Sequence, residues 1–287
     1  MSELIFTADC ENPVMLKKYL CERCGVSQGL LRKLKNTDGG ITRNGSHIRT
    51  VDEVFHGDII VLNMDETGGS ANIVPNGSLS ADIVYESRNL VVFGKPAGMP
   101  VHPSVRHRND TLANLFAYLY PDCVFRAVNR LDKDTSGLCI IAKNAYAANL
   151  LQHSCEKVYY AAVQGETGMT GHIDAPIARE QESIIIRCVR SDGRKAVTDY
   201  RKIAENDEFS LLEIHLETGR THQIRVHMSY SGHPLAGDEL YGGSRERISR
   251  QALHCGKITF REPETGEIIT AEAELPEDMK SLFENLF

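Results

Sequence analysis

Apolar side chains in the first quarter of the chain recur at helical spacing and then alternate with polar ones. The spacing predicts two short helices, over 16–20 and 30–34. Short strands are predicted after them, including the alternating segment 58–62 and a hairpin whose turn is the dipeptide Asn44-Gly45. We therefore expect a small α+β domain over residues 1–66.

The next stretch has a different composition. Residues 67–81 are rich in Gly, Ser, Asn and Pro and show no apolar periodicity. Such a segment is typical of a linker, which can join two domains without coupling their folds. We expect the second domain to occupy residues 82–287.

The second domain is predicted to consist mainly of strands. Asn144 is expected to cap one of its few helices. The predicted strands lie over 83–86, 90–93, 138–142, 158–163, 183–189, 196–203 and 210–216. The fold class that follows is α+β, with a large mixed, mostly antiparallel sheet and a few helices, preceded by the small domain.

Charge is divided unevenly along the chain. The 287 residues carry a net charge of −7. Segment 15–50, however, has eight basic and two acidic residues, whereas 262–287 has eight acidic residues and one lysine. A basic face can bind a phosphate backbone on an acidic protein, because attraction depends on the surface presented. Nucleic acid is therefore not excluded as a partner.

Several classes of protein are disfavoured by what the sequence lacks. No basic leader precedes an apolar core, and no run of eighteen apolar residues occurs, so we expect a cytoplasmic protein without membrane contact. The eight cysteines are expected to be reduced, and the single pair Cys21 and Cys24 makes only half of a zinc site. Phosphate-binding glycine motifs are absent. We expect no metal and no nucleotide cofactor.

The densest polar cluster lies directly before a predicted buried strand. It runs Asn129-Arg130-Leu131-Asp132-Lys133-Asp134-Thr135-Ser136-Gly137. One interpretation is a surface turn with local ion pairs. The alternative is a carboxylate that neighbouring bases keep ionised and available as a nucleophile.

A second cluster spans 218–228. We predict a helix there with Thr221 as its cap, on which His222 and Arg225 share one side. His222 and His227 are five positions apart, which is unfavourable for binding one metal ion together. Structural or RNA-contacting roles fit these histidines better.

The motifs along the second domain resemble those of the RluA-type pseudouridine synthases. They occur in that family's order and cover essentially the whole domain. They are KPAGMPVHPS from Lys95, RLDKDTSGL from Arg130, KVYYAAVQG from Lys157, GRKAVTDY from Gly193 and TGRTHQIRVHMSYSGHPLAGDELYGG from Thr218. Two positions depart from the family pattern: Asn129 stands where His is usual, and Gly94 where Asn is common.

The resemblance implies a role for each matching residue. Asp132 matches the family nucleophile, Tyr159 the active-site tyrosine, and Arg225 the arginine that pairs with the aspartate. Arg130 matches the side chain that fills the RNA stack after the target base leaves. Three further side chains of these motifs are interpreted as RNA-binding: Lys157, Arg220 and His222.

The implied reaction is the isomerisation of uridine within ribosomal or transfer RNA, without a cofactor and by a monomer. The bond to the glycosidic nitrogen breaks, the uracil rotates, and a bond to carbon forms. Asp132 would attack either the uracil ring or the anomeric carbon, and Tyr159 is a candidate for the base. Flipping the uridine out of folded RNA costs roughly a few kcal/mol.

The first domain resembles, less specifically, the small RNA-binding module named after a ribosomal protein. Arg32, Lys33 and Arg43 lie in its matching segments and are predicted RNA contacts. Two rival functions remain open at this stage. A binding-only RNA chaperone would need only the basic residues, whereas a hydrolase using Asp132 would release uracil and so change the mass of the RNA.

Overall fold

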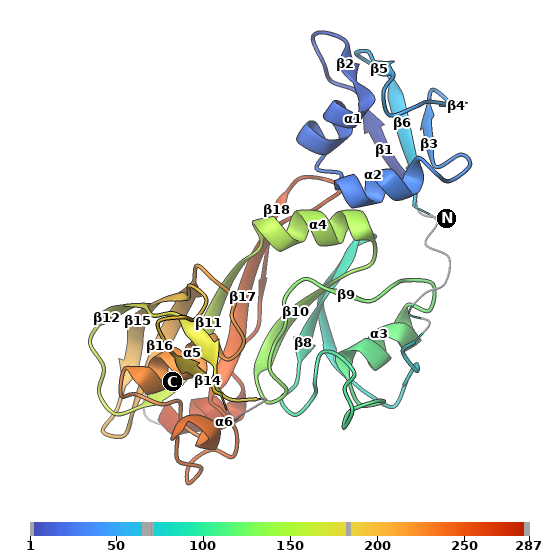
Figure 1. Cartoon of the computed structure of the whole chain (residues 1–287). Helices are drawn as coiled ribbons and strands as arrows, with labels where there is room; N and C mark the ends of the chain where they lie inside the picture. The colour runs from blue at the N-terminus through green and yellow to red at the C-terminus, as the bar shows by residue number, and fades with distance from the viewer. Residues whose placement is uncertain (1–2, 65–69, 71, 182–184, 284–287) are drawn as a thin grey trace.

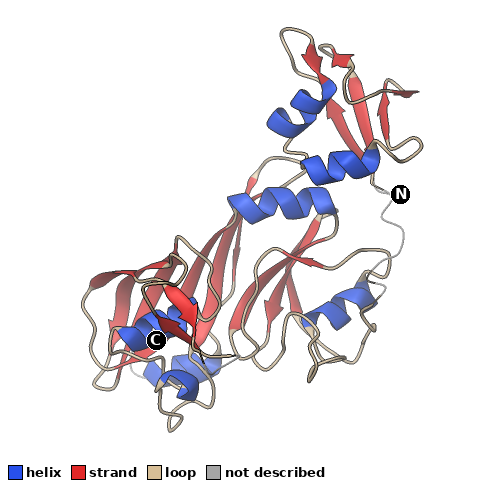
Figure 2. Cartoon of the chain, viewed as in Figure 1, coloured by secondary structure: helices blue, strands red, loops and turns tan. Residues whose placement is uncertain are grey.

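The computed structural model describes residues 3–64, 70, 72–181 and 185–283. Figure 1 shows a small N-terminal unit placed at one end of a larger body that is built on a long, curved sheet. Strands dominate both parts, and Figure 2 shows the helices lying on the faces and at the ends of the sheets. The predicted α+β class is confirmed.

The small unit is a four-stranded sheet packed against short helices. The predicted Asn44-Gly45 turn has φ values of 50° and 79°, the left-handed pair that a type I′ hairpin requires. The sheet has the order β1 (Glu3–Thr7), β6 (Ile59–Asn63), β3 (Ile41–Arg43) and β4 (Ser46–His47). The other elements are β2 (Val14–Met15), which pairs with β5 (Glu53–Val54), and α1 (Leu16–Lys18), η1 (Tyr19–Arg23) and α2 (Gln28–Leu34).

The larger body has one main sheet in which almost every neighbouring pair is antiparallel. The order is β12 (Thr170–Asp174), β15 (Val197–Glu205), β16 (Phe209–Leu216), β11 (Glu156–Gln164), β17 (Leu253–Arg261), β10 (Ser136–Ala142), β8 (Leu90–Lys95) and β7 (Asp82–Glu86). Two further strands join it: β18 (Ile268–Glu272) pairs with β17, and β9 (Arg126–Ala127) pairs with β10. The predicted mixed, mostly antiparallel sheet is therefore confirmed.

Short helices accompany this sheet. They are α3 (Leu112–Leu119), α4 (Ala145–Ser154), α5 (Gln223–Tyr230), η2 (Glu239–Tyr241), α6 (Glu277–Lys280) and η3 (Ser281–Phe283). Asn144 caps α4 as predicted, because its side-chain oxygen accepts the N–H of Ala147 at 2.8 Å. Among the described residues, no helix is long and apolar enough to span a bilayer.

The strand predicted over 183–189 is wrong in extent and in place. Residues 183 and 184 lie outside the described ranges, and only β14 (Arg187–Val189) is a strand. It pairs with β13 (Ile177–Arg179) in a separate two-stranded sheet. Ile177 and Val189 pack there against Val226 of α5, so contact with this helix, not with the main sheet, determines where the hairpin lies.

Among the described strands of the main sheet, one pairing is parallel, and it brings β10 against β17. Gly137 makes this approach possible: its φ is +107°, and a Cβ at this position would lie 2.3 Å from the carbonyl oxygen of Cys255. Any other residue would push the strands apart or strain the backbone. The loop that precedes β10 therefore lies beside β17 and the strands that continue the sheet beyond it.

The small unit is docked onto α4 of the larger body, as Figure 1 shows. Tyr146 is 5% exposed and belongs to the apolar core of the small unit, with its ring 5.8 Å from that of Phe6. Asn149 donates a hydrogen bond to the carbonyl of Gly25, and Leu150 lies against the same glycine. The two parts therefore share a core, so their folds are coupled, contrary to the expectation from the linker composition.

The predicted linker also makes contacts. Residues 67–69 and 71 lie outside the described ranges. Ser70 accepts the N–H of Phe125 at 2.9 Å, and Asn114 donates to the carbonyl of Val74 at 2.7 Å. Segment 72–81 is thus attached to the larger body along its length. The division of the chain at residues 66 and 82 stays a prediction.

The shared core gives a first prediction. Tyr146→Ala should lower the free energy of unfolding by about 3 kcal/mol, because a large buried ring is lost and a cavity remains. Hydrogen exchange should accelerate throughout residues 3–64 and stay slow in β10. Tyr230→Ala, at a site that is 65% exposed, is the control and should change little. Unchanged exchange in the small unit would show that α4 does not stabilise it.

Candidate active site

Asp132 lies in the loop that enters β10, and neighbouring segments hold this loop through its backbone. Lys95 is 1% exposed, and its ammonium donates to the carbonyls of Pro96, Met99 and Lys133 at 2.8, 2.8 and 3.0 Å. Burial lowers the pKa of Lys95 to about 8, while three carbonyl acceptors favour its charged form. The lysine therefore ties the segment after β8 to the residue next to Asp132.

The other side of the loop is held in a similar way. Arg250 donates to the carbonyl of Asp134 at 3.1 Å, and Gln251 donates to the hydroxyl of Thr135 at 3.3 Å. Asn129 is buried before the loop, where its amide donates to the carbonyl of Leu138 and its oxygen accepts the N–H of Ile140. Asn129 thus closes the loop onto β10.

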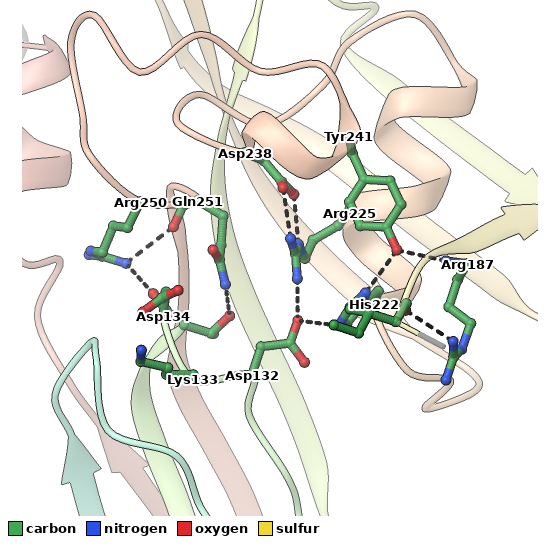
Figure 3. Close-up of polar contacts among 12 residues, drawn as sticks. Asp132, Lys133, Asp134, Arg187, His222, Arg225, Asp238, Tyr241, Arg250 and Gln251 are labelled. Atoms are coloured by element: carbon green, nitrogen blue, oxygen red, sulfur yellow. Dashed lines mark hydrogen bonds and ion pairs between the residues drawn. The ribbon is translucent and has the colours of Figure 1, made fainter. Parts of the chain in front are cut away.

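The carboxylate of Asp132 meets a buried arginine (Figure 3). Arg225 donates from Nη1 to Oδ2 of Asp132 at 2.9 Å, across 93 positions of sequence. Its Nε and Nη2 donate to the two oxygens of Asp238 at 2.6 and 2.7 Å. Asp238 is 2% exposed, and Arg225 is also buried. One guanidinium therefore bridges two carboxylates, and both carboxylates raise its pKa, so Arg225 stays charged.

The start of α5 differs from the prediction. Thr221 is not its cap: His222 occupies the N-cap position in the left-handed conformation, with φ of 58° and no side-chain cap bond. Gln223, the first residue of the helix, instead fixes the preceding turn, because its side-chain oxygen accepts the N–H of Arg220 at 2.9 Å. The left-handed turn directs the ring of His222 toward Asp132, with 3.7 Å between Nε2 and Oδ2.

Tyr159 reaches the same site from β11. The register with β17 shifts between Val158 and Tyr159, so that Gly256 is skipped and Tyr159 faces Cys255. Such bulges often reorient side chains beside active sites. The ring of Tyr159 is 7% exposed, and burial raises the pKa of its hydroxyl well above the ordinary value. Tyr159 is therefore a neutral phenol in the free protein.

These side chains line one open cleft, whose empty volume is about 380 Å³ including the mouth. Its charged lining residues come from two loops and one helix, while Tyr159, Ile224 and Leu253 supply apolar surface. An apolar wall with a few converging polar groups is typical of a small-ligand site. The charged and polar residues of the lining are Arg130, Asp132, Thr135, Arg220, His222, Gln223 and Arg225.

The predicted site residues fall into two groups. Arg130, Asp132, Tyr159, Arg220, His222 and Arg225 all line the cleft. The other predicted RNA contacts lie outside it. The ammonium of Lys157 donates to the carbonyl of Cys155, and Arg32 and Lys33 are exposed on the last turn of α2. Arg43 is engaged with the carbonyl of Glu53.

Three residues of the site were not identified from the sequence. Asp238, Tyr241 and Lys95 lie within the quoted motifs, but their spacing gives no sign that Asp238 pairs with Arg225 or that Lys95 is buried. Tyr241 lies with its ring 5.0 Å from the guanidinium of Arg225 and bonds to His222. The one available hint was that the motif containing Arg225 also contains an acidic residue, Asp238, in addition to the partner Asp132 that the resemblance implies.

The described residues offer little to a metal ion. No group of three His, Cys, Asp or Glu side chains among them is arranged to ligate one. All eight cysteines are free. The ionisable side chains of the cleft are one carboxylate, three arginines, one histidine and one phenol.

Comparison with known proteins gives consistent results. A family profile described as RNA pseudouridylate synthase matches residues 89–230. The chain is 39% identical over 277 residues to a Bacillus subtilis protein described as "Uncharacterized RNA pseudouridine synthase YjbO", covering 93% of this chain and 97% of that one. It is 40% identical over 232 residues to the ribosomal large subunit pseudouridine synthase D of Zymomonas mobilis, covering 71% and 72% of the two chains.

A solved structure is also similar. The human RNA pseudouridylate synthase domain containing 1 aligns with a TM-score of 0.57 and 26% identity, covering 74% of this chain and 96% of that one.

The buried bridge at Arg225 gives a second prediction. Asp238→Asn should lower the free energy of unfolding by about 3 kcal/mol, because a buried guanidinium loses a charged partner. Urea denaturation measures the change. Glu272→Gln removes a carboxylate from an exposed ion pair with Lys257 and should cost less than about 1 kcal/mol. Equal and small losses in the two variants would contradict the assigned importance of Asp238.

Proposed function

The chain belongs to the RNA pseudouridine synthase family, and from this premise we propose that it isomerises uridines in structured RNA with Asp132 as the nucleophile. The observation that carries the proposal is the contact of 2.9 Å between Asp132 and the buried Arg225 in a cleft that also contains Tyr159. The guanidinium of Arg225 balances the charge of this carboxylate, and a carboxylate is a group that can form a covalent bond to carbon.

The reaction begins when the flipped uridine enters the cleft. Asp132 forms a bond either to the uracil ring or to the anomeric carbon, and the bond between the glycosidic nitrogen and the sugar breaks. The uracil rotates and is rejoined to the anomeric carbon through a ring carbon, and the bond to Asp132 breaks so that the carboxylate is regenerated. The joining carbon loses its proton, and the former glycosidic nitrogen gains one. Arg225 balances the charge of Asp132 and holds its carboxylate in place.

Tyr159 is assigned to the uracil base. Its ring lies in the apolar wall of the cleft and is suited to packing against a planar pyrimidine. Its hydroxyl carries a proton in the free protein, because burial raises its pKa. Packing against the base is therefore the better-supported role, and deprotonation of the ring carbon is the second.

Arg130 is assigned to the RNA duplex. It is exposed and lies at the cleft, two positions before Asp132. A guanidinium can stack on neighbouring bases, so it can fill the gap that the flipped uridine leaves. This contact would offset part of the cost of flipping, roughly a few kcal/mol. Arg220 and His222 line the same cleft, and His222 is considered further below.

The target is a uridine of ribosomal or transfer RNA. Relatives named for the large ribosomal subunit, such as that of Zymomonas mobilis, favour ribosomal RNA. We propose that the protein acts as a monomer in the cytoplasm, where such RNA is found, and without a nucleotide cofactor. Analysis of the product separates isomerisation, which leaves the RNA mass unchanged, from a hydrolase that would release uracil.

A third prediction tests the nucleophile. Asp132→Asn should abolish isomerisation, because a neutral amide of the same shape cannot attack carbon, while the fold and RNA affinity stay close to those of the unchanged protein. Tritium release from RNA labelled at uracil C5 measures turnover. Asp134→Asn, two positions away, is the matched control and should stay active. Normal turnover by Asp132→Asn would refute the assignment.

A fourth prediction concerns the basic face of the small unit. The double variant Arg32→Glu, Lys33→Glu should bind RNA more weakly, with a salt dependence reduced by about one unit of slope per lost phosphate contact. The rate at saturating RNA should not change, because the cleft is intact. The full chain is used, since truncation would expose the Tyr146 side of the shared core.

Reversing two charges elsewhere provides the control for that variant. Lys257→Glu, Lys280→Glu makes the same change in net charge, at one position just before the acidic C-terminal segment and one within it. Its affinity for RNA should fall less than that of the double variant on α2. Equal losses would mean that net charge, and not contact by Arg32 and Lys33, governs binding.

A further inference from the structure

The histidine at the start of α5 is placed to control the orientation of the nucleophile (Figure 3). We infer that His222 is a positioning residue: in its Nε2–H tautomer it shares the Oδ2 atom of Asp132 with Arg225, which leaves Oδ1 as the attacking oxygen. This inference rests on the proposed function, since it assumes that Asp132 is the nucleophile. It replaces the RNA-binding role predicted for His222 from the sequence.

The tautomer follows from the hydrogen bonds of Tyr241. Its hydroxyl oxygen accepts the backbone N–H of Arg187 at 3.0 Å and lies 2.8 Å from Nδ1 of His222. A tyrosine hydroxyl has one hydrogen, and no other described residue has an acceptor bonded to it. Donation of that hydrogen to Nδ1 gives it an acceptor and places the ring hydrogen on Nε2, the nitrogen that faces Asp132.

Arg225 and His222 both face the same oxygen of Asp132. Arg225 Nη1 lies 2.9 Å and His222 Nε2 lies 3.7 Å from Oδ2. Oδ1 accepts no hydrogen bond from any described residue. Because the carboxylate is fixed by one oxygen, the other keeps its lone pairs available for bond formation.

The backbone at His222 indicates a functional constraint. Its φ of 58° is uncommon for a residue with a side chain, and Asn44, at a hairpin turn, is the only other described non-glycine with positive φ. The ring of His222 is 12% exposed and makes an edge contact with the ring of Tyr241, with 5.7 Å between centroids. The strained turn and the packing together fix the direction of Nε2.

The charges around His222 agree with a neutral ring. Burial is the largest cause that lowers its pKa, and Arg225 and Arg187 act in the same direction. Asp132 and Asp238 oppose them. A neutral imidazole can accept from Tyr241 on one side and present N–H to Asp132 on the other, whereas an imidazolium would lose its acceptor.

Tyr241 connects this pair to the rest of the site. Its hydroxyl is hydrogen-bonded to His222, and its ring lies beneath the guanidinium of Arg225. The same hydroxyl accepts the backbone N–H of Arg187 in β14. Arg225, which bonds to Oδ2, and His222, which faces it, are thus both supported by one side chain. Loss of its hydroxyl alone should disturb His222 while leaving the ring under Arg225 in place.

The tautomer can be measured without any activity assay. Nitrogen-15 chemical shifts of labelled histidine in the full chain distinguish Nδ1–H from Nε2–H, and His222→Asn identifies the His222 signals by their loss. We expect the Nε2–H pattern, and in Tyr241→Phe a mixture of tautomers. Tyr230→Phe, at the exposed end of α5, should leave the signals unchanged. An Nδ1–H pattern in the unchanged protein would overturn the inference.

Kinetics separate positioning from RNA contact. Asparagine tolerates the left-handed conformation but is too short to reach Asp132, so His222→Asn should keep the backbone. We expect the single-turnover rate at saturating RNA to fall about tenfold to a hundredfold, with RNA affinity within about twofold. His222→Gln, whose amide nitrogen reaches the Nε2 position, should recover part of the rate.

Two outcomes contradict the inference in different ways. Weaker RNA affinity with an unchanged rate at saturation would make His222 an RNA contact. An unchanged rate and affinity would leave it with no part in the reaction. Either result is distinct from failure of the proposed function, which would appear as turnover by Asp132→Asn.

Discussion

The bridge from Arg225 to two carboxylates is the interaction on which the active site depends. A buried guanidinium must keep charged partners, and Asp238 supplies both of its oxygens while Asp132 supplies one. The pair with Asp238 is buried, so it fixes the direction of the arginine. The pair with Asp132 is partly open to the cleft, so the same arginine can support a carboxylate that remains accessible to RNA.

The sheet is built so that these groups can meet. Gly137 lets β10 approach β17 in the one parallel pairing, and Asn129 closes the loop before it. Lys95 fixes the backbone beside Asp132 through three carbonyls. The loop that carries Asp132 is therefore held mostly by backbone contacts, which leave the carboxylate of Asp132 to face Arg225 and His222.

The N-terminal unit shares an apolar core with the larger body. Because Tyr146 of α4 completes its core, basic residues on α2 stand in a fixed relation to the cleft. A fixed arrangement lowers the entropy lost when both surfaces engage one RNA molecule. Family membership defines the reaction, and this docking bears on which structured RNA can reach both surfaces.

The sequence by itself determined the fold class, most strands and the Asn144 cap, because periodicity and capping are local properties. The grouping of Asp132, Tyr159 and Arg225 was implied by the resemblance of the motifs to a known family and not by periodicity. It misplaced the strand over 183–189 and the cap at Thr221, where packing on α5 and a left-handed turn prevailed. Only the tertiary structure decided that Asp238 is the second partner of Arg225 and that α4 joins the two parts. Such contacts join residues distant in sequence, and no local pattern encodes which distant partner satisfies a buried charge.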